Sequence, residues 1–316
     1  MTPIIIGGTT INKTDLIRQK WLDNDFYGTT FSANYKDEKL DVILGGGYNK
    51  YEGSHFGKII WARYASTSEL EDRYYNDAAS KTDGNIFAKA NYQVAEKLSL
   101  FADLQLRNVH YKANGAETGV VNANFNFFNP KAGLNLEINE NNQLYASYAR
   151  ANREPNRTDY KNGSPRPEKL NDFELGLRHV STKVKVNANM YYMAYKDQLI
   201  LTGELDDVGA PIRKNSGDSY RLGLEIDATV AVLNNLIIRP NVTISTNKNK
   251  DFFFKRDGVL TSLGNTNIAF SPGFIAGNIV SFVPMKNLQI SFLSKFVGEQ
   301  YMANIDAEDS KLKSYF

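Results

Sequence analysis

Apolar and polar residues alternate along most of this chain, in segments of about ten residues. The clearest segment spans residues 220–230, where Tyr220, Leu222, Leu224, Ile226, Ala228 and Val230 share one face. The other face carries Arg221, Gly223, Glu225, Asp227 and Thr229. Successive side chains of a strand point to opposite faces, so each segment predicts a strand that places one face in a core or in lipid.

The joints between these segments alternate between short turns and long polar loops. Short turns are expected at 36–39, 95–97, 139–142, 181–182, 234–235 and 284–287. Long loops are expected near 50–81, 112–122, 150–169, 203–215, 247–267 and 301–313. Short turns at one end of every hairpin and long loops at the other are typical of an outer-membrane β-barrel, with the long loops extracellular. The rhythm predicts about 12 complete strands and the start of another at 314–316.

A soluble all-β protein or adhesin is the alternative to a membrane barrel. Soluble sandwiches also alternate, but their strands are nearer 5–6 residues long and their loops follow no such rhythm. The mean hydropathy of −0.43 is typical of a soluble protein but does not exclude a barrel, because only alternate residues face lipid and the lumen face is polar. No apolar run is long enough for a transmembrane helix. We therefore predict an all-β fold, an antiparallel transmembrane β-barrel.

Composition excludes several classes of site and partner. The chain has no cysteine, which rules out disulfides and thiolate metal sites. The net charge of +2 gives no argument for binding nucleic acid. The three histidines are too scattered for a metal motif, and no catalytic constellation stands out. We therefore expect no enzyme activity, no metal site and no cofactor.

Several stretches, in this order and spacing, resemble the barrel of TonB-dependent outer-membrane receptors. They lie at residues 18–28, 45–48, 55–57, 74–77, 87–89, 144–155, 167–170 and 173–178. The most specific is LYASYARANREP at 144–155, an aromatic-rich strand that leads into an arginine-proline loop. The strand FELGLR at 173–178 then returns with an acidic residue. The resemblance spans nearly the whole chain.

The resemblance implies a 22-stranded barrel closed by an N-terminal plug and located in the bacterial outer membrane. On this interpretation residues 1–316 form a partial barrel of about 12–13 strands, without a plug domain or signal peptide of their own. The family imports a scarce solute, such as a ferric siderophore, haem or cobalamin, and is driven by periplasmic TonB acting through the plug. Outer-membrane lipid and lipopolysaccharide are the other expected partners. A passive porin or structural barrel is the alternative function.

An arginine-rich segment is the first candidate for ligand binding. Arg150, Arg153, Arg157 and Arg166 place several fixed cations in the predicted loop at 150–169. Guanidinium groups suit carboxylate, catecholate or phosphate ligands, or the sugar-phosphates of lipopolysaccharide. The alternative is a solvated loop whose arginines pair locally with Glu154, Asp159 and Glu168.

A second candidate lies in the first long loop. Tyr51, His55, Tyr74 and Tyr75 supply three aromatic rings and an imidazole, which suit a flat aromatic or haem-like ligand. An aromatic girdle at the membrane boundary is the competing explanation for the same residues.

Overall fold

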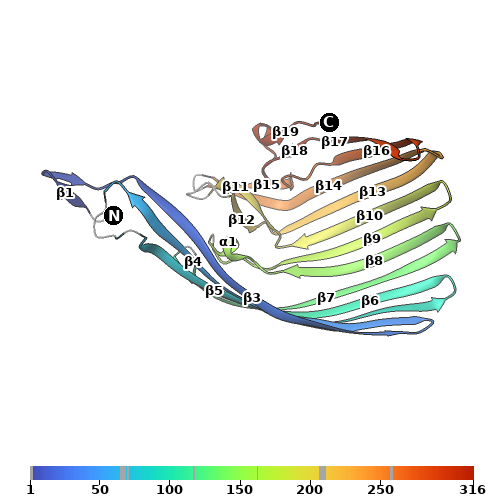
Figure 1. Cartoon of the computed structure of the whole chain (residues 1–316), viewed down its shortest axis with the longest axis horizontal. Helices are drawn as coiled ribbons and strands as arrows, with labels where there is room; N and C mark the ends of the chain where they lie inside the picture. The colour runs from blue at the N-terminus through green and yellow to red at the C-terminus, as the bar shows by residue number, and fades with distance from the viewer. Residues whose placement is uncertain are drawn as a thin grey trace. The chain divides into compact units, whose positions relative to one another are not determined.

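The computed structural model describes residues 3–64, 69, 71–116, 118–161, 163–205, 211–256 and 259–316. One antiparallel sheet of 13 strands dominates (Figure 1). Twelve of its strands lie in the order β17-β16-β14-β13-β10-β9-β8-β7-β6-β5-β4-β3, and β15 pairs with β14. Neighbours in the sheet are therefore also neighbours in the sequence, apart from short insertions, as the alternation predicted. Within the described residues the path ends at two edge strands, β17 and β3.

The first six strands of the sheet are β3 (Leu16–Lys36), β4 (Leu40–Ala62), β5 (Arg73–Ala95), β6 (Leu98–Gly115), β7 (Gly119–Asn139) and β8 (Asn142–Arg153). The others are β9 (Glu168–Val180), β10 (Val184–Lys196), β13 (Asp218–Leu233), β14 (Leu236–Arg256), β15 (Val259–Asn267), β16 (Phe274–Met285) and β17 (Leu288–Val297).

Three short hairpins and two single-turn helices make up the remaining elements of the residues that the structure describes. The hairpins pair β1 (Ile4–Ile6) with β2 (Thr9–Ile11), β11 (Leu199–Leu205) with β12 (Pro211–Asn215), and β18 (Gln300–Tyr301) with β19 (Lys311–Leu312). The helices are α1 (Arg157–Tyr160) and the 3-10 turn η1 (Glu308–Ser310). No helix among the described residues is long and apolar enough to cross a membrane.

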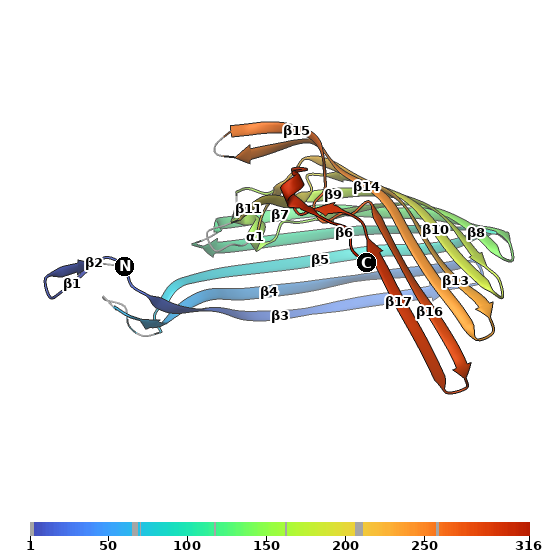
Figure 2. The same cartoon turned by 90° about the horizontal axis from the view of Figure 1, so that it is seen from above.

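Every predicted short turn joins two neighbouring strands of the sheet. The turn between β3 and β4 shows why such turns form: the Asp37 carboxylate accepts 2.9 Å hydrogen bonds from the backbone N–H groups of Lys39 and Leu40. Aspartate stabilises a turn by satisfying backbone groups that no strand partner reaches. Figure 2 shows the turns of β13–β14 and β16–β17 at one end of these strands.

The chain divides into two compact units. Unit 1 comprises Met1–Phe31, Gly45–Ile86 and Arg107–Asn126, and unit 2 comprises Ser32–Leu44, Phe87–Leu106 and Phe127–Phe316. The strands β8 to β17 belong entirely to unit 2. Unit 1 consists mainly of the parts of β3 to β7 that fall within its three residue ranges.

In unit 2 the strand register aligns apolar side chains into continuous rows across the sheet. One row runs through Leu134, Ala146, Leu175, Met190, Leu224, Ile244 and Phe274. The next runs through Leu136, Leu144, Leu177, Ala188, Ile226, Val242, Ala276 and Phe296. Many of these side chains are exposed, including Leu175 at 51% and Ile244 at 54%. An exposed apolar face of this extent indicates contact with lipid.

The opposite face of unit 2 is polar. The row beside the apolar ones runs through Asn135, Tyr145, Gly176, Asn189, Glu225 and Thr243. In a barrel these positions face the lumen, where side chains of different strands form hydrogen bonds with one another. Tyr145 donates a 3.0 Å hydrogen bond to the side-chain oxygen of Asn189, for example. The double-faced strand predicted from the sequence is therefore confirmed.

Much of the predicted loop sequence is strand instead. The loop expected at 50–81 is largely occupied by β4, which ends at Ala62, and β5, which begins at Arg73. The loops at 112–122, 203–215 and 247–267 likewise contain strand residues of β6, β7, β11, β12, β14 and β15. The stretch at 301–313 contains η1 and β19, and the stretch at 150–169 contains α1. The parts of these loops at 65–68, 70, 117, 162, 206–210 and 257–258 lie outside the described residues.

The reason for this difference is visible in β6. In its unit 2 part the apolar side chains Leu100, Leu104 and Leu106 are exposed. In its unit 1 part the buried side chains are Val109, Tyr111 and Ala113, and the exposed Lys112 is polar. The alternation continues, but in the unit 1 part the apolar side chains are buried and the polar ones are exposed. The pattern of apolar residues on the exposed face therefore ends before the strand does, and the rest of the strand was predicted as a loop.

Candidate ligand-binding site

After β8 ends, a capped helical turn fixes the next part of the arginine-rich segment. The side chain of Asn156 accepts hydrogen bonds from the backbone N–H groups of Thr158 and Asp159, and Asp159 accepts one from the N–H of Asn156 at 2.8 Å. This reciprocal capping box fixes α1, whose first residue is Arg157. Asp159 is buried and belongs to the cap.

Arg153 forms an ion pair. Its guanidinium lies 2.9 Å from the Glu168 carboxylate, directly across the β8–β9 ladder. The same carboxylate oxygen accepts the backbone N–H of Leu199 at 3.0 Å. The local ion pair that the sequence offered as the alternative is thus present here.

Arg166 is also paired, with an acid that the sequence did not suggest. Its Nε and Nη2 donate to one oxygen of Asp197 at 3.0 and 2.6 Å. The Asn215 side chain brackets the backbone of Arg166, accepting its N–H at 2.8 Å and donating to its carbonyl at 2.9 Å. The hydrogen bond with Asp197 raises the pKa of Arg166 above its already high value. The Arg166 side chain is 62% exposed, so this pair contributes little to stability.

Arg150 differs from these two. It lies in β8 opposite Asn171, and its Nε is buried without a hydrogen-bond partner among the described residues. A buried donor left unsatisfied costs about 1–3 kcal/mol, which a ligand acceptor would relieve. Unlike Arg153 and Arg166, Arg150 therefore keeps a guanidinium donor that no carboxylate of the described residues occupies.

The four aromatic candidates lie in strands of unit 1 and form two pairs. Tyr51 in β4 donates a 2.7 Å hydrogen bond to Asn24, and its hydroxyl lies 3.4 Å from Nε2 of His55. Tyr74 and Tyr75 in β5 meet edge to face, with ring centroids 5.0 Å apart. The Arg18 guanidinium lies 5.4 Å from the Tyr74 ring centroid. These contacts give the rings fixed orientations rather than the freedom of a loop.

The sequence did not predict a stack of cationic and aromatic side chains that also lies in unit 1. Trp21 and Phe56 stack with ring centroids 6.2 Å apart, and the Arg73 guanidinium lies 3.7 Å from the Phe56 centroid. Lys58 lies 5.8 Å from the Trp21 ring and 3.1 Å from the Glu71 carboxylate. Aromatic and basic residues alternate in these strands, and this pattern could have predicted the stack. The same pattern is equally typical of an aromatic girdle at the membrane boundary.

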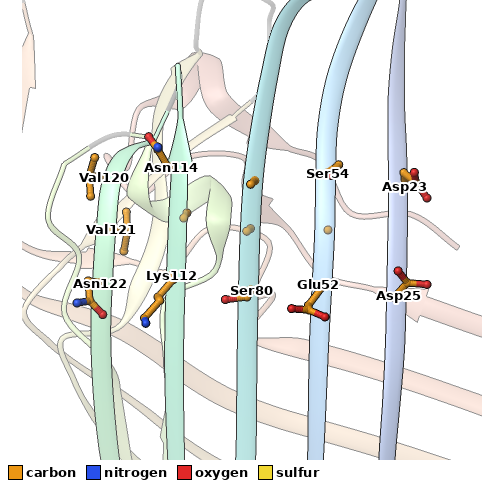
Figure 3. A pocket seen from close by; sticks show the side chains of 14 residues that line it. Asp23, Asp25, Glu52, Ser54, Ser80, Lys112, Asn114, Val120, Val121 and Asn122 are labelled. Carbon is orange, nitrogen blue, oxygen red and sulfur yellow. The ribbon is translucent and has the colours of Figure 1, made fainter.

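Unit 1 also contains a cavity of about 620 Å³ (Figure 3). Asp25 and Glu52 from β3 and β4 lie in one row with Ser80, Lys112 and Asn122 from the next three strands. The lining carries more carboxylates than ammonium groups, so it favours cationic or polyhydroxylated groups. Among the described residues no group of three or more His, Cys, Asp or Glu side chains could hold a metal ion.

Comparison with known proteins gives one family and many similar structures. Residues 6–316 match the family model described as TonB-dependent receptor-like, β-barrel. The ferric-catecholate import receptor Fiu from E. coli K12, in its closed form, is 14% identical with a TM-score of 0.66. That alignment covers 94% of this chain and 47% of Fiu. No curated protein sequence matches the chain.

Two further structures show the same relationship. The siderophore receptor PiuA from Acinetobacter baumannii is 15% identical with a TM-score of 0.71, over 96% of this chain and 50% of that one. The copper transporter OprC is 16% identical with a TM-score of 0.76, over 94% and 48% of the two chains. The chain thus spans about half the length of these proteins. At such identities the likeness establishes the fold and leaves the ligand open.

Proposed function

Because the chain belongs to the TonB-dependent receptor-like β-barrel family, whose members are outer-membrane proteins of Gram-negative bacteria, we propose that it forms part of an uptake receptor. The receptor imports a scarce, bulky solute, with a ferric siderophore as first choice and haem or cobalamin as others. The family match over residues 6–316 carries this proposal. The apolar outer rows and polar inner rows of unit 2 support it, because they suit a barrel between lipid and lumen.

The similar proteins favour a metal complex as the solute. Fiu and PiuA are named for ferric-catecholate import and siderophore reception, whereas OprC is named as a copper transporter. Two separate candidates for ligand binding are Arg150 in unit 2, for its unsatisfied donor, and the ordered aromatic pairs in unit 1. Arg153 and Arg166 are neutralised by Glu168 and Asp197, so Arg157 is the other predicted arginine proposed to contribute positive charge near Arg150. Aromatic rings suit flat ligand groups, and guanidinium groups suit anionic oxygens.

The partners follow from the same mode of action. Energy reaches such a receptor from periplasmic TonB through a plug, so TonB and a plug domain are the proposed protein partners. Outer-membrane lipid contacts the apolar rows of unit 2, and lipopolysaccharide contacts the polar outer surfaces above them. No cofactor and no nucleic acid enter this function.

Uptake of a radiolabelled iron complex tests the proposal. Cells that express the intact receptor are supplied with ⁵⁵Fe bound to a tris-catecholate, with and without TonB. The proposal expects accumulation that requires both the receptor and TonB. A matched copper arm, supplied as the labelled metal, separates an iron receptor from one like OprC.

A passive porin is the competing function, and the same assay distinguishes it. A porin would admit small solutes equally well without TonB, because diffusion needs no energy coupling. Receptor-dependent uptake that persists unchanged after deletion of TonB would overturn the proposal.

A further inference from the structure

A cavity of about 250 Å³ in unit 2 is lined by two arginines and no acidic residue. Arg213 comes from β12 and Arg221 from β13, and the amide side chains of Gln198 and Asn304 complete the polar lining. Ile200 and Ile268 supply apolar wall. The volume is below the roughly 300–1,000 Å³ of sites for drug-sized ligands, so the cavity suits a small group.

Neither arginine has a carboxylate partner among the described residues. Arg221 donates to the Ser271 hydroxyl at 2.9 Å and to the Asn247 side-chain oxygen at 3.3 Å, and both acceptors are neutral. For Arg213 the described residues provide no ion pair at all. Arg153 and Arg166, in contrast, are both neutralised by acids. Two half-buried cations that share a wall without a counter-charge create a positive potential in the cavity.

The floor of the cavity is fixed in place before any ligand arrives. Asn304 is completely buried and its side-chain oxygen accepts hydrogen bonds from the Ala269 N–H at 2.9 Å and from Asn249 at 3.2 Å. Its amide NH2 group donates to the carbonyl of Leu201, which belongs to β11. Three separate segments are thereby held at set positions around the two arginines, so little ordering is left for binding to supply.

Further donors surround the arginines. The side-chain oxygen of Gln198 accepts the Ser219 hydroxyl at 2.7 Å, which leaves the Gln198 NH2 group as a donor toward a ligand. Guanidinium forks match the oxygen pairs of carboxylates and phosphates and bind them more strongly than neutral donors do.

We propose that this cavity is a binding subsite for a compact oxyanion, a carboxylate or phosphate group held between Arg213 and Arg221. The inference rests on the cavity alone and does not require the uptake proposed above. It applies to an anion of a few non-hydrogen atoms, whether free or carried as one arm of a larger solute.

Isothermal titration of the intact receptor in detergent tests this, with malonate and inorganic phosphate as separate probes at constant ionic strength. We expect saturable binding of at least one probe. Arg213→Gln and Arg221→Gln should each raise its Kd at least tenfold, as removal of a charged hydrogen-bond donor implies. Arg213→Lys should restore only part of the affinity, because a point charge lacks the fork.

Arg239→Gln is the matched control. Arg239 in β14 also donates to a serine, Ser281 at 3.3 Å, but does not line the cavity. Its variant should bind the probe like the unmodified receptor. Lack of saturable binding of both probes, or an equal loss in the control, would overturn the inference. The titration does not involve transport, so it can fail while TonB-dependent uptake succeeds, and the reverse.

Discussion

The side chain of Asn249 donates a 3.2 Å hydrogen bond to that of Asn304, 55 residues further along the chain. Both side chains are fully buried. Asn249 also donates to the Thr266 hydroxyl at 3.2 Å, which is itself buried. These bonds fasten the segment around η1 to the outer part of the β14–β15 hairpin, so sequences that resemble flexible surface loops form a single hydrogen-bonded cluster.

Asn304→Leu should destabilise this cluster. The replacement removes three hydrogen bonds and leaves the Ala269 N–H without its acceptor. An unsatisfied buried donor should lower the free energy of unfolding by about 1–3 kcal/mol. Hydrogen exchange at the Ala269 amide should accelerate. Asn287→Leu, in the exposed turn between β16 and β17, is the control and should leave that exchange unchanged. Unaltered exchange in both variants would refute the role given to Asn304.

Gly176→Val should destabilise the lumen face of unit 2. Gly176 lies directly opposite Tyr145 in the β8–β9 ladder, and any Cβ at this position would overlap the tyrosine ring. The ring is held by Asn189 at 3.0 Å and by Arg178, whose guanidinium lies 4.6 Å from its centroid. Overpacking of this kind typically costs about 1–3 kcal/mol in the free energy of unfolding.

A double-mutant cycle isolates the cause of that loss. In a Tyr145→Ala background the ring is gone, so Gly176→Val should cost clearly less than it does in the unmodified protein. Equal costs in the two backgrounds, measured by urea unfolding in lipid vesicles, would show that the close contact of Gly176 with Tyr145 is not responsible.

Asp37 should titrate below its ordinary value of 3.8. Hydrogen bonds from the backbone of Lys39, and then from that of Leu40, favour the carboxylate and hold the pKa of Asp37 down. A depressed pKa means that the turn is stabilised above the unfolded-state pKa. That stabilisation is lost as the pH falls through the folded-state pKa. A carbon-13 NMR titration of the side chain measures this directly, and a pKa at or above 3.8 would contradict it.

The predicted arginines should separate into two classes. Arg153→Gln and Arg166→Gln remove ion pairs at partly exposed sites, so each should cost no more than about 1 kcal/mol of stability. Each should also change the affinity for a ferric tris-catecholate less than threefold, as measured by fluorescence quenching. Arg150→Gln should weaken that binding about tenfold or more, the loss of one charged donor. The same small effect from all three would remove Arg150 from the site.

The sequence predicted most strands of unit 2 well because they are amphipathic with a period of two, whereas β11, β12 and β15 fall largely in predicted loops. The segment from Tyr220 to Val230 lies within β13, and the predicted turn at 234–235 joins it to β14. Lipid on one side and water on the other impose this pattern on every strand, so local sequence is sufficient.

Unit 1 and the oxyanion cavity could not be predicted in the same way. Beyond Arg107 the strand β6 buries Val109 and exposes Lys112, so the reversed pattern resembled a polar loop. Arg213 and Asn304 meet only because β12 and the segment before η1 come together in space, over 90 residues apart. Contacts at that separation leave no periodic signal in the sequence.

A membrane barrel requires that one face of the unit 2 strands contacts lipid and the other contacts water. The chain has no cysteine, so single cysteines at Leu224 and Glu225 can be labelled with nitroxide in the intact receptor in lipid vesicles. Spin-label relaxation by oxygen, which partitions into lipid, is compared with relaxation by a water-soluble nickel chelate. The account predicts that oxygen dominates at Leu224 and nickel at Glu225. Equal access of nickel to both positions would contradict the membrane barrel.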